Sequence, residues 1–185
     1  RDDRFDPRRG SLLSVSLSYS PRFLGSSLSY IRSFSQYTMY KEIGGSLTWA
    51  SSYRLGLASA FGENLIPSKR FFAGGGTSIR GFKLDAVGPL DLWTGLPEGG
   101  EATVVMNQEL RFPIYKMFRG VVFFDAGNVY SRLKDLNPLR LRTGAGFGLR
   151  IDTPVGLIRV DYGLNLKPRT GEPRSTIFFS LGQAF

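Results

Sequence analysis

Hydrophobic and polar residues alternate along most of this chain with a period of two, and helical periodicity is almost absent. Period-two alternation is the pattern of a β-strand with two different faces. The clearest example is LRTGAGFGLRIDT, residues 141–153, where Phe147 and Leu149 alternate with Gly146, Gly148 and Arg150. Eight segments show the pattern and predict strands: 10–20, 26–40, 46–62, 101–113, 119–130, 141–153, 156–166 and 174–185.

The length of these segments favours strands that cross a membrane. Soluble strands usually have about 5 to 6 residues, whereas a tilted transmembrane strand needs about 9 to 11. The connections 41–45, 113–119 and 153–156 are short, and alternate with longer ones at 63–100, 130–140 and 166–173, although 20–25 is also short. Outer-membrane barrels have short periplasmic turns and longer external loops. We therefore predict an all-β, antiparallel transmembrane barrel with eight strands in this chain.

A soluble β-sandwich or lipocalin-like barrel is the alternative to a membrane barrel. Such folds place their apolar face inward, around a dry core. In this chain one face carries glycine together with Arg and Asp, a combination that packs poorly as a core. This face holds Gly144, Gly146, Gly148, Arg150, Arg159, Asp161 and Gly163. We expect it to line the lumen, with Asp152 and Asp161 in a charge ladder beside Arg150 and Arg159.

Composition excludes several kinds of chemistry. The 185 residues contain no Cys and no His, which excludes thiolate metal sites and removes the commonest general base. We predict no metal, no cofactor and no enzymatic activity. The net charge of +9 suggests nucleic acid, but the basic residues are spread along the chain and segregate from the aromatic face. Nucleic acid is therefore not an expected partner.

The stretch RFFAGGGTSIRGF, residues 70–82, raises a separate question. It lacks the spacing and the following helix of a phosphate-binding loop. It occurs with GVVFFDAGNVY at 120–130, GAGFGLRIDTPVGLIRVDYG at 144–163 and a final Phe185. In this order and spacing, from RFDPRRG (4–10) to Phe185, these motifs resemble the C-terminal barrel of the bacterial surface-antigen superfamily. That superfamily contains BamA-type and TamA-type assembly factors and two-partner-secretion transporters.

The resemblance implies that residues 63–100 fold inward as a loop of a single barrel domain, 1–185. The loop motif is Arg80, Gly81 and Phe82, and its wall partners are Phe123, Asp125 and Gly127. From the residues alone, Asp125 could instead pair with Arg142 or Arg150 while Arg80 is solvated. The inward glycines would leave room for the loop against the wall.

The resemblance also implies that these eight strands are the last half of a sixteen-stranded barrel. An eight-stranded barrel is filled by its own side chains, so it has no space for the loop. The upstream half or a second copy would complete the wall. The first ten residues lack the apolar core of a signal peptide, so we expect the numbering to start inside a longer precursor.

The implied function is insertion of outer-membrane proteins, or translocation of proteins across a bacterial or organellar outer membrane. Lipid and unfolded outer-membrane or secreted proteins are the expected partners. A passive channel, or an anchor barrel for a fused passenger, is the alternative. Phe185 resembles a C-terminal recognition signal and is also compatible with a girdle aromatic, while Gly182 could weaken the last strand at an opening seam.

Overall fold

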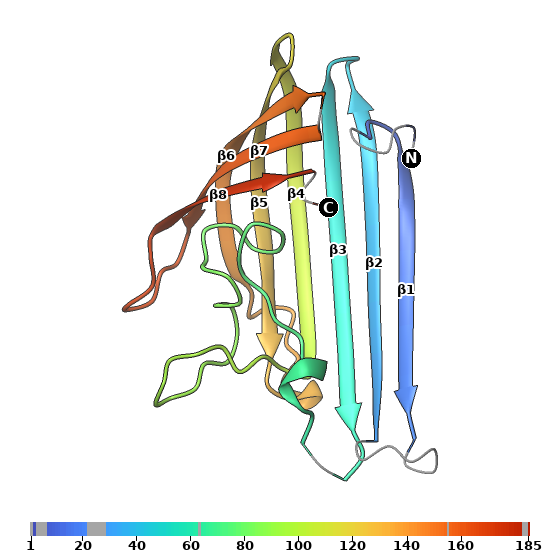
Figure 1. Ribbon diagram of the computed structural model, residues 1–185, viewed down its shortest axis with the longest axis vertical. Coiled ribbons are helices and arrows are strands. Elements are labelled where there is room, and N and C mark those ends of the chain that lie inside the picture. Colours follow the sequence, from blue (N-terminus) through green and yellow to red (C-terminus); the bar gives the residue numbers. More distant parts are fainter. Residues whose placement is uncertain (1, 3–6, 22–28, 63, 155, 183–184) are drawn as a thin grey trace.

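The computed structural model describes residues 2, 7–21, 29–62, 64–154, 156–182 and 185. They form one eight-stranded antiparallel sheet in which each strand pairs with its neighbours in sequence (Figure 1). Its strands are β1 (Gly10–Ser20), β2 (Tyr30–Ile43), β3 (Leu47–Ala60), β4 (Ala102–Tyr115), β5 (Phe118–Tyr130), β6 (Arg142–Thr153), β7 (Gly156–Asn165) and β8 (Ser175–Leu181). Two short 3-10 helices, η2 (Pro67–Lys69) and η3 (Leu133–Asp135), lie in the connections.

All eight predicted strands are present, and the fold class is confirmed. The boundaries of β1 match the prediction, and the other strands differ from it by a few residues. The predicted start of the second strand, 26–28, lies outside the described residues, as do residues 183 and 184 of the last. The strands could be located because period-two alternation is strong where each face has a different environment.

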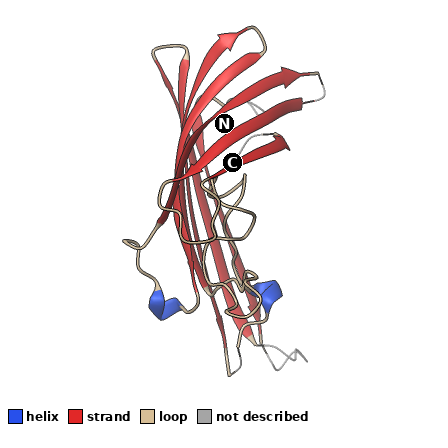
Figure 2. Cartoon of the chain, turned by 90° about the vertical axis from the view of Figure 1, so that its left-hand side faces the viewer, coloured by secondary structure: helices blue, strands red, loops and turns tan. Residues whose placement is uncertain are grey.

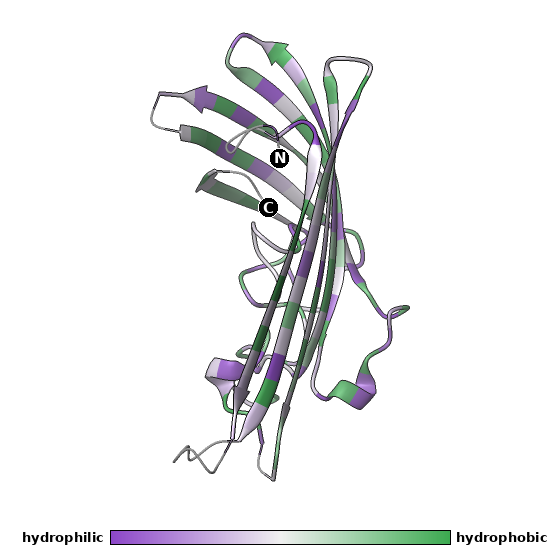
Figure 3. Cartoon of the chain, turned by 90° about the vertical axis from the view of Figure 1, so that its right-hand side faces the viewer, coloured by the Kyte–Doolittle hydropathy of each residue, from purple (hydrophilic) through white to green (hydrophobic). Residues whose placement is uncertain are grey.

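The two faces of the sheet differ in polarity, as the alternating colours along the strands show (Figure 3). We call inner the face against which residues 64–100 pack. It carries most of the buried charged side chains: Arg80 contacts it from the loop, and Glu109, Arg111, Asp125, Arg150, Arg159 and Asp161 belong to it. The outer face carries exposed apolar side chains, among them Leu17, Tyr53, Leu55, Phe147 and Phe179. An apolar band facing outward is the arrangement of a sheet in lipid.

Short turns and long connections lie at opposite ends of the strands. The β2–β3 turn covers residues 44–46, and the β4–β5 turn covers 116–117. Gly44 and Gly45 have positive φ angles of 60° and 80°, as a tight hairpin turn requires. At the other end lie 61–101, 131–141 and 166–174. The β1–β2 connection, predicted as the short 20–25, is residues 21–29, of which 22–28 lie outside the described residues.

The sheet is open, so this chain is a partial barrel. No pairing joins β1 to β8 within the described residues. Strands β6–β8 lean across the direction of β1–β5, and the sheet is strongly curved (Figures 1 and 2). No helix in the described part of the chain is long and apolar enough to span a membrane.

Two apolar clusters attach the long loop to the inner face. The larger unites loop and wall side chains that are at most 5% exposed: Ala73, Ile79, Phe82, Val87, Val105 and Val129. In the smaller cluster, Phe71 and Leu65 pack with Ala58 of β3, and Phe34 of β2 lies against them. Burial of this apolar surface stabilises the inward position of the loop, at about 25 cal/mol per Å².

Candidate functional site

Arg80 lies at the centre of a buried ion network between the loop and the wall. Its Nε and Nη2 donate to the two carboxylate oxygens of Asp125 at 2.7 and 2.8 Å, a bidentate pair. Its backbone N–H also donates to Asp125 Oδ2, at 3.0 Å. Nη1 donates to Glu109 Oε1 at 2.5 Å and lies 3.6 Å from Asp161 Oδ2. The guanidinium stacks 3.5 Å from the centre of the Phe123 ring, and Arg80 is 1% exposed.

The backbone just before Arg80 is held by side chains from three strands. Three consecutive carbonyl oxygens, those of residues 76–78, each accept a hydrogen bond from a different wall side chain. In order, the donors are Arg159 on β7 at 2.6 Å, Arg54 on β3 at 2.7 Å and Asn107 on β4 at 2.5 Å. We call these three side chains the carbonyl latch. Because they reach the loop from separate strands, they fix its direction as well as its depth.

Glycines in the loop and in the wall allow the loop backbone to approach the sheet closely. Gly81 has a φ of 96°, which side chains rarely adopt, and it lies against the backbone of Leu164 on β7. A Cβ at Gly144 would collide with the Arg80 carbonyl oxygen, and one at Gly163 would collide with the Gly81 nitrogen. These two inner-face glycines therefore form the surface on which the loop backbone rests.

The inner-face charges continue from Arg80 as a ladder. Arg150 Nη1 donates to Asp161 Oδ1 at 2.5 Å, and its Nη2 lies 3.5 Å from Glu109 Oε1. Arg159 Nε lies 3.2 Å from Asp161 Oδ2. Shared carboxylates of this kind keep several buried guanidinium groups compensated. Further toward the short turns, Arg119 pairs with Asp152 at 2.7 Å.

The remaining predicted residues take other places in the same assembly. Gly127 leaves room for the Ile79 side chain, Gly146 for the Phe123 ring, and Gly148 for the contact between Asp161 and Arg150. Phe82 is 2% exposed and lies 5.0 Å, centroid to Cζ, from Arg142. Arg142 itself pairs with Glu172 of the β7–β8 loop, and not with Asp125.

Sequence reasoning missed four members of this site as loop partners. Glu109, Asn107, Arg54 and Arg111 all bind the loop or its carboxylate partners. A signal was present: in the β4–β5 register Asn107 lies opposite Asp125, and Glu109 lies opposite Phe123. Directly opposed residues share a face, so once Asp125 faces the loop, these two must do so as well.

The alternation predicts that Phe185 continues the outward face of β8, and the structure shows that it does not. Its carbonyl oxygen accepts a hydrogen bond from Tyr40 Oη at 2.8 Å, and its ring lies 5.8 Å from Arg111 Cζ. Both Tyr40 and Arg111 are buried on the inner face. Gly182 has a φ of 86°, which breaks the extended backbone that strict alternation assumes.

The β7–β8 loop has its own polar centre at Glu172. Its carboxylate accepts hydrogen bonds from the Arg169 N–H at 2.9 Å and from Asn165 Nδ2 at 3.1 Å, besides its pair with Arg142. Partial burial raises the pKa of Glu172, but these donors together outweigh burial, so its pKa lies below the usual value.

The network is suited to holding the loop against the wall. Its carboxylates are engaged by arginines, and in the described residues no group of three or more Asp, Glu, His or Cys is placed to hold a metal ion. A loop latched by buried charges inside a curved sheet with an apolar outer face defines a partial membrane barrel with an inward-folded loop.

The chain belongs to the Omp85 superfamily, whose domain matches residues 1–185. It is similar to a crystal structure of BamA from Haemophilus ducreyi that lacks POTRA domains 1–3. The TM-score is 0.83 at 23% identity, with 96% of this chain and 39% of that chain covered. This likeness shows that the fold is that of the BamA barrel.

Curated relatives come from bacteria and from eukaryotes. The outer membrane protein assembly factor BamA of Nitratidesulfovibrio vulgaris is 28% identical over 191 residues, covering 100% of this chain and 24% of the relative. The sorting and assembly machinery component 50 homolog of Homo sapiens is 27% identical over 194 residues, covering 93% and 40%. Outer envelope protein 39, chloroplastic, of Arabidopsis thaliana is 35% identical over 121 residues, covering 59% and 31%.

The chain thus spans between 24% and 40% of the length of these relatives. Family and relatives place it in a bacterial or organellar outer membrane, as the sequence predicts. The relatives are named as assembly components or envelope proteins, and none of these names describes an enzyme.

Proposed function

We propose that this chain is the barrel domain, residues 1–185, of a protein that inserts outer-membrane proteins or translocates proteins across that membrane. The observation that carries the proposal is the inward loop, which buried ion pairs and the carbonyl latch hold against the wall. A lumen segment fixed by so many polar contacts narrows the path for solutes, which favours this role over that of a passive channel.

The edge strands support the same activity. The outer edges of β1 and β8 have no strand partner within the described residues. Unpaired backbone N–H and C=O groups can accept an incoming strand by β-augmentation, and in lipid they are costly until they do. In the complete protein, the upstream half of the barrel or a second copy pairs with these edges, and a substrate strand enters where the seam opens.

In this role the site residues position the inward loop against the wall. Arg80, Gly81 and Phe82 form the loop motif, and Phe123, Asp125 and Gly127 form its seat. The inner glycines and charges of β6 and β7 complete the wall, and Phe185 serves as a C-terminal signal. The domain needs no cofactor and catalyses no reaction; its partners are lipid and unfolded outer-membrane or secreted proteins.

The test is reconstitution of the full-length protein in phospholipid vesicles with a urea-denatured outer-membrane barrel as substrate. Insertion is scored by protease protection and by heat-modifiable migration of the substrate. We expect wild type to insert the substrate and Arg80→Ala to lose most of this activity. Lys83→Ala is the matched control, because Lys83 lies in the same loop and its side chain is exposed. Steady single-channel conductance without insertion would instead establish the passive channel.

A further inference from the structure

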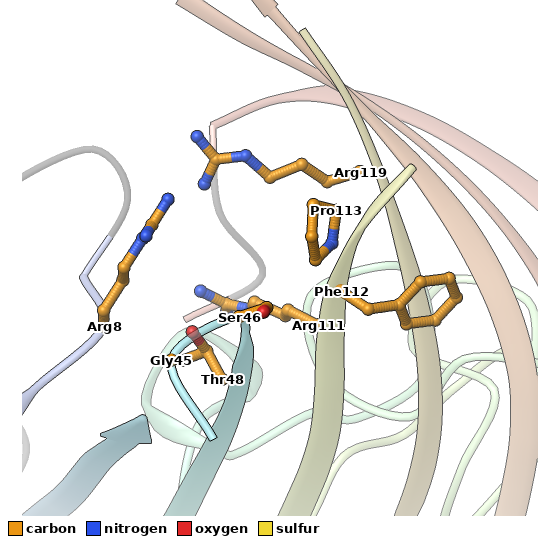
Figure 4. A pocket seen from close by; sticks show the side chains of 8 residues that line it. All are labelled: Arg8, Gly45, Ser46, Thr48, Arg111, Phe112, Pro113 and Arg119. Carbon is orange, nitrogen blue, oxygen red and sulfur yellow. The ribbon is translucent and has the colours of Figure 1, made fainter. Parts of the chain in front are cut away.

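A cavity of about 210 Å³ lies at the short-turn end of the sheet, away from the loop motif. Three arginines line it, Arg8, Arg111 and Arg119, and the hydroxyl residues Ser46 and Thr48 are among the others. Among the described residues that line it none is acidic, although Arg119 pairs with Asp152 and Arg111 with Glu109 just outside the lining. Figure 4 shows Arg111 and Arg119 extending from β4 and β5 toward the side on which Arg8 lies.

Strand register explains why these side chains converge. Thr48 on β3 lies opposite Arg111 on β4, and Pro113 on β4 lies opposite Arg119 on β5. Opposed residues share a face, and residues two apart on one strand do so as well, so all four project from the inner face. The site is therefore built on three rigid strands, with the β2–β3 turn at its rim.

Arg111 has hydrogen-bonding capacity that the protein does not use. It is 5% exposed, and its Nε donates to Glu109 Oε2 at 2.9 Å, with Nη2 2.8 Å from the same oxygen. Its Nη1 is buried without a hydrogen-bond partner. A buried guanidinium with unsatisfied donors is costly unless an anion meets it.

The charge balance of the inner network points the same way. Among the described residues, four arginines are buried (Arg80, Arg111, Arg150 and Arg159), and three carboxylates are buried (Glu109, Asp125 and Asp161). Glu109 also forms ion pairs with Arg80 and Arg150, so its single negative charge is shared among three arginines. Arg111 stands at the end of this network, where the excess positive charge meets the cavity.

We propose that this cavity is a binding site for a phosphate group. Guanidinium groups from three directions, together with hydroxyls, suit a tetrahedral oxyanion with several acceptor oxygens better than a planar carboxylate. The cavity is too small for a folded peptide segment. It lies on the inner face at the short-turn end of the strands, so free phosphate reaches it from the lumen and a headgroup reaches it only from the rim of the barrel. The phosphate is therefore that of a phospholipid headgroup or free phosphate. The site is separate from the assembly activity, since it needs neither substrate nor seam opening.

The experiment measures binding of two probes to the full-length protein in neutral detergent. Inorganic phosphate is titrated at constant ionic strength against chloride, and micelles are doped with phosphatidylglycerol against phosphatidylcholine. We expect a saturable rise in the thermal unfolding midpoint with at least one phosphate probe. A response to phosphatidylglycerol alone identifies the headgroup as the source, and a response to both identifies the phosphate group itself. No saturable response to either probe overturns the proposal.

Variants separate the site from general electrostatics. Arg111→Gln and Arg119→Gln should each weaken binding of the effective probe at least tenfold. Thr48→Val, which leaves every arginine in place, should weaken it severalfold and covers the case that an arginine variant fails to fold. The matched control is Arg9→Gln, since Arg9 is exposed, adjacent to Arg8 in sequence and outside the cavity lining. An equal loss with Arg9→Gln, or unchanged binding in all three site variants, would refute the site.

Discussion

The pairing of Arg80 with Asp125 predicts a strong energetic coupling between loop and wall. Two charged hydrogen bonds at 2.7 and 2.8 Å join the side chains, and both are at most 1% exposed. Removing one partner of a buried pair leaves an uncompensated charge, which costs about 3–5 kcal/mol. We therefore expect Arg80→Ala and Asp125→Ala each to lower the free energy of unfolding by about that amount.

The double variant should lose clearly less free energy of unfolding than the two single variants added together, because it leaves neither of these two charges without its partner. The coupling energy should reach about 2–3 kcal/mol, near the upper range for residues in one network. Urea unfolding of the lipid-reconstituted protein, followed by tryptophan fluorescence, measures all four corners of the cycle. Protease cleavage within residues 76–82 reports separately whether the loop leaves the wall.

A second cycle on an exposed ion pair calibrates the first. Arg9 and Glu42 approach to 2.6 Å, but the Arg9 side chain is 73% exposed. An exposed pair contributes about 0–1 kcal/mol, so its coupling should be small. Additive effects at Arg80 and Asp125, or a coupling no larger than that of the exposed pair, would refute a loop fixed by buried charge.

Three further outcomes follow from the same geometry. Gly163→Ala should cost about 1–3 kcal/mol in urea unfolding and expose the loop to protease, because its Cβ collides with the Gly81 nitrogen. Arg54→Ala should cost about 1.5–3 kcal/mol by the same assay, since it removes a charged donor from the Thr77 carbonyl; an unchanged midpoint would contradict the carbonyl latch. The pKa of Glu172 is depressed in the folded state, so its contribution is present above the unfolded value of about 4.3 and is lost as pH falls through the folded pKa. Protection factors for hydrogen exchange in residues 166–174, corrected for the intrinsic rate at each pH, should therefore fall on acidification below about pH 4, and Glu172→Gln should remove most of that pH dependence.

The strands were predictable from sequence and the loop contacts were not, for a physical reason. Alternation is local: each residue of β6 or β7 reveals its face through its immediate neighbours. The partners of Arg80 lie 29 and 45 residues along the chain, so they depend on strand register and on the path of the returning loop. The family resemblance supplied Asp125, whereas Glu109 needed the β4–β5 register. The placement of Phe185 on the inner face could not be derived, because the turn at Gly182 ends the alternation that the prediction extended.

The polar contacts to residues 76–80 come from some strands of the sheet and not from others. Within the described part of the chain, every hydrogen bond and ion pair from the wall to residues 76–80 comes from β3, β4, β5 or β7. None of these contacts involves β1, β2 or β8. Strand β2 reaches the loop through Phe34 and through the Arg32 guanidinium stacked on the Phe71 ring, and β8 reaches it through Phe178. Apolar contacts lack the directional requirement of a buried ion pair, so an edge strand can shift without leaving a charge uncompensated. Under the proposed function, this distribution lets the seam open between edge strands while Arg80 stays bound to the wall, as strand-by-strand insertion requires.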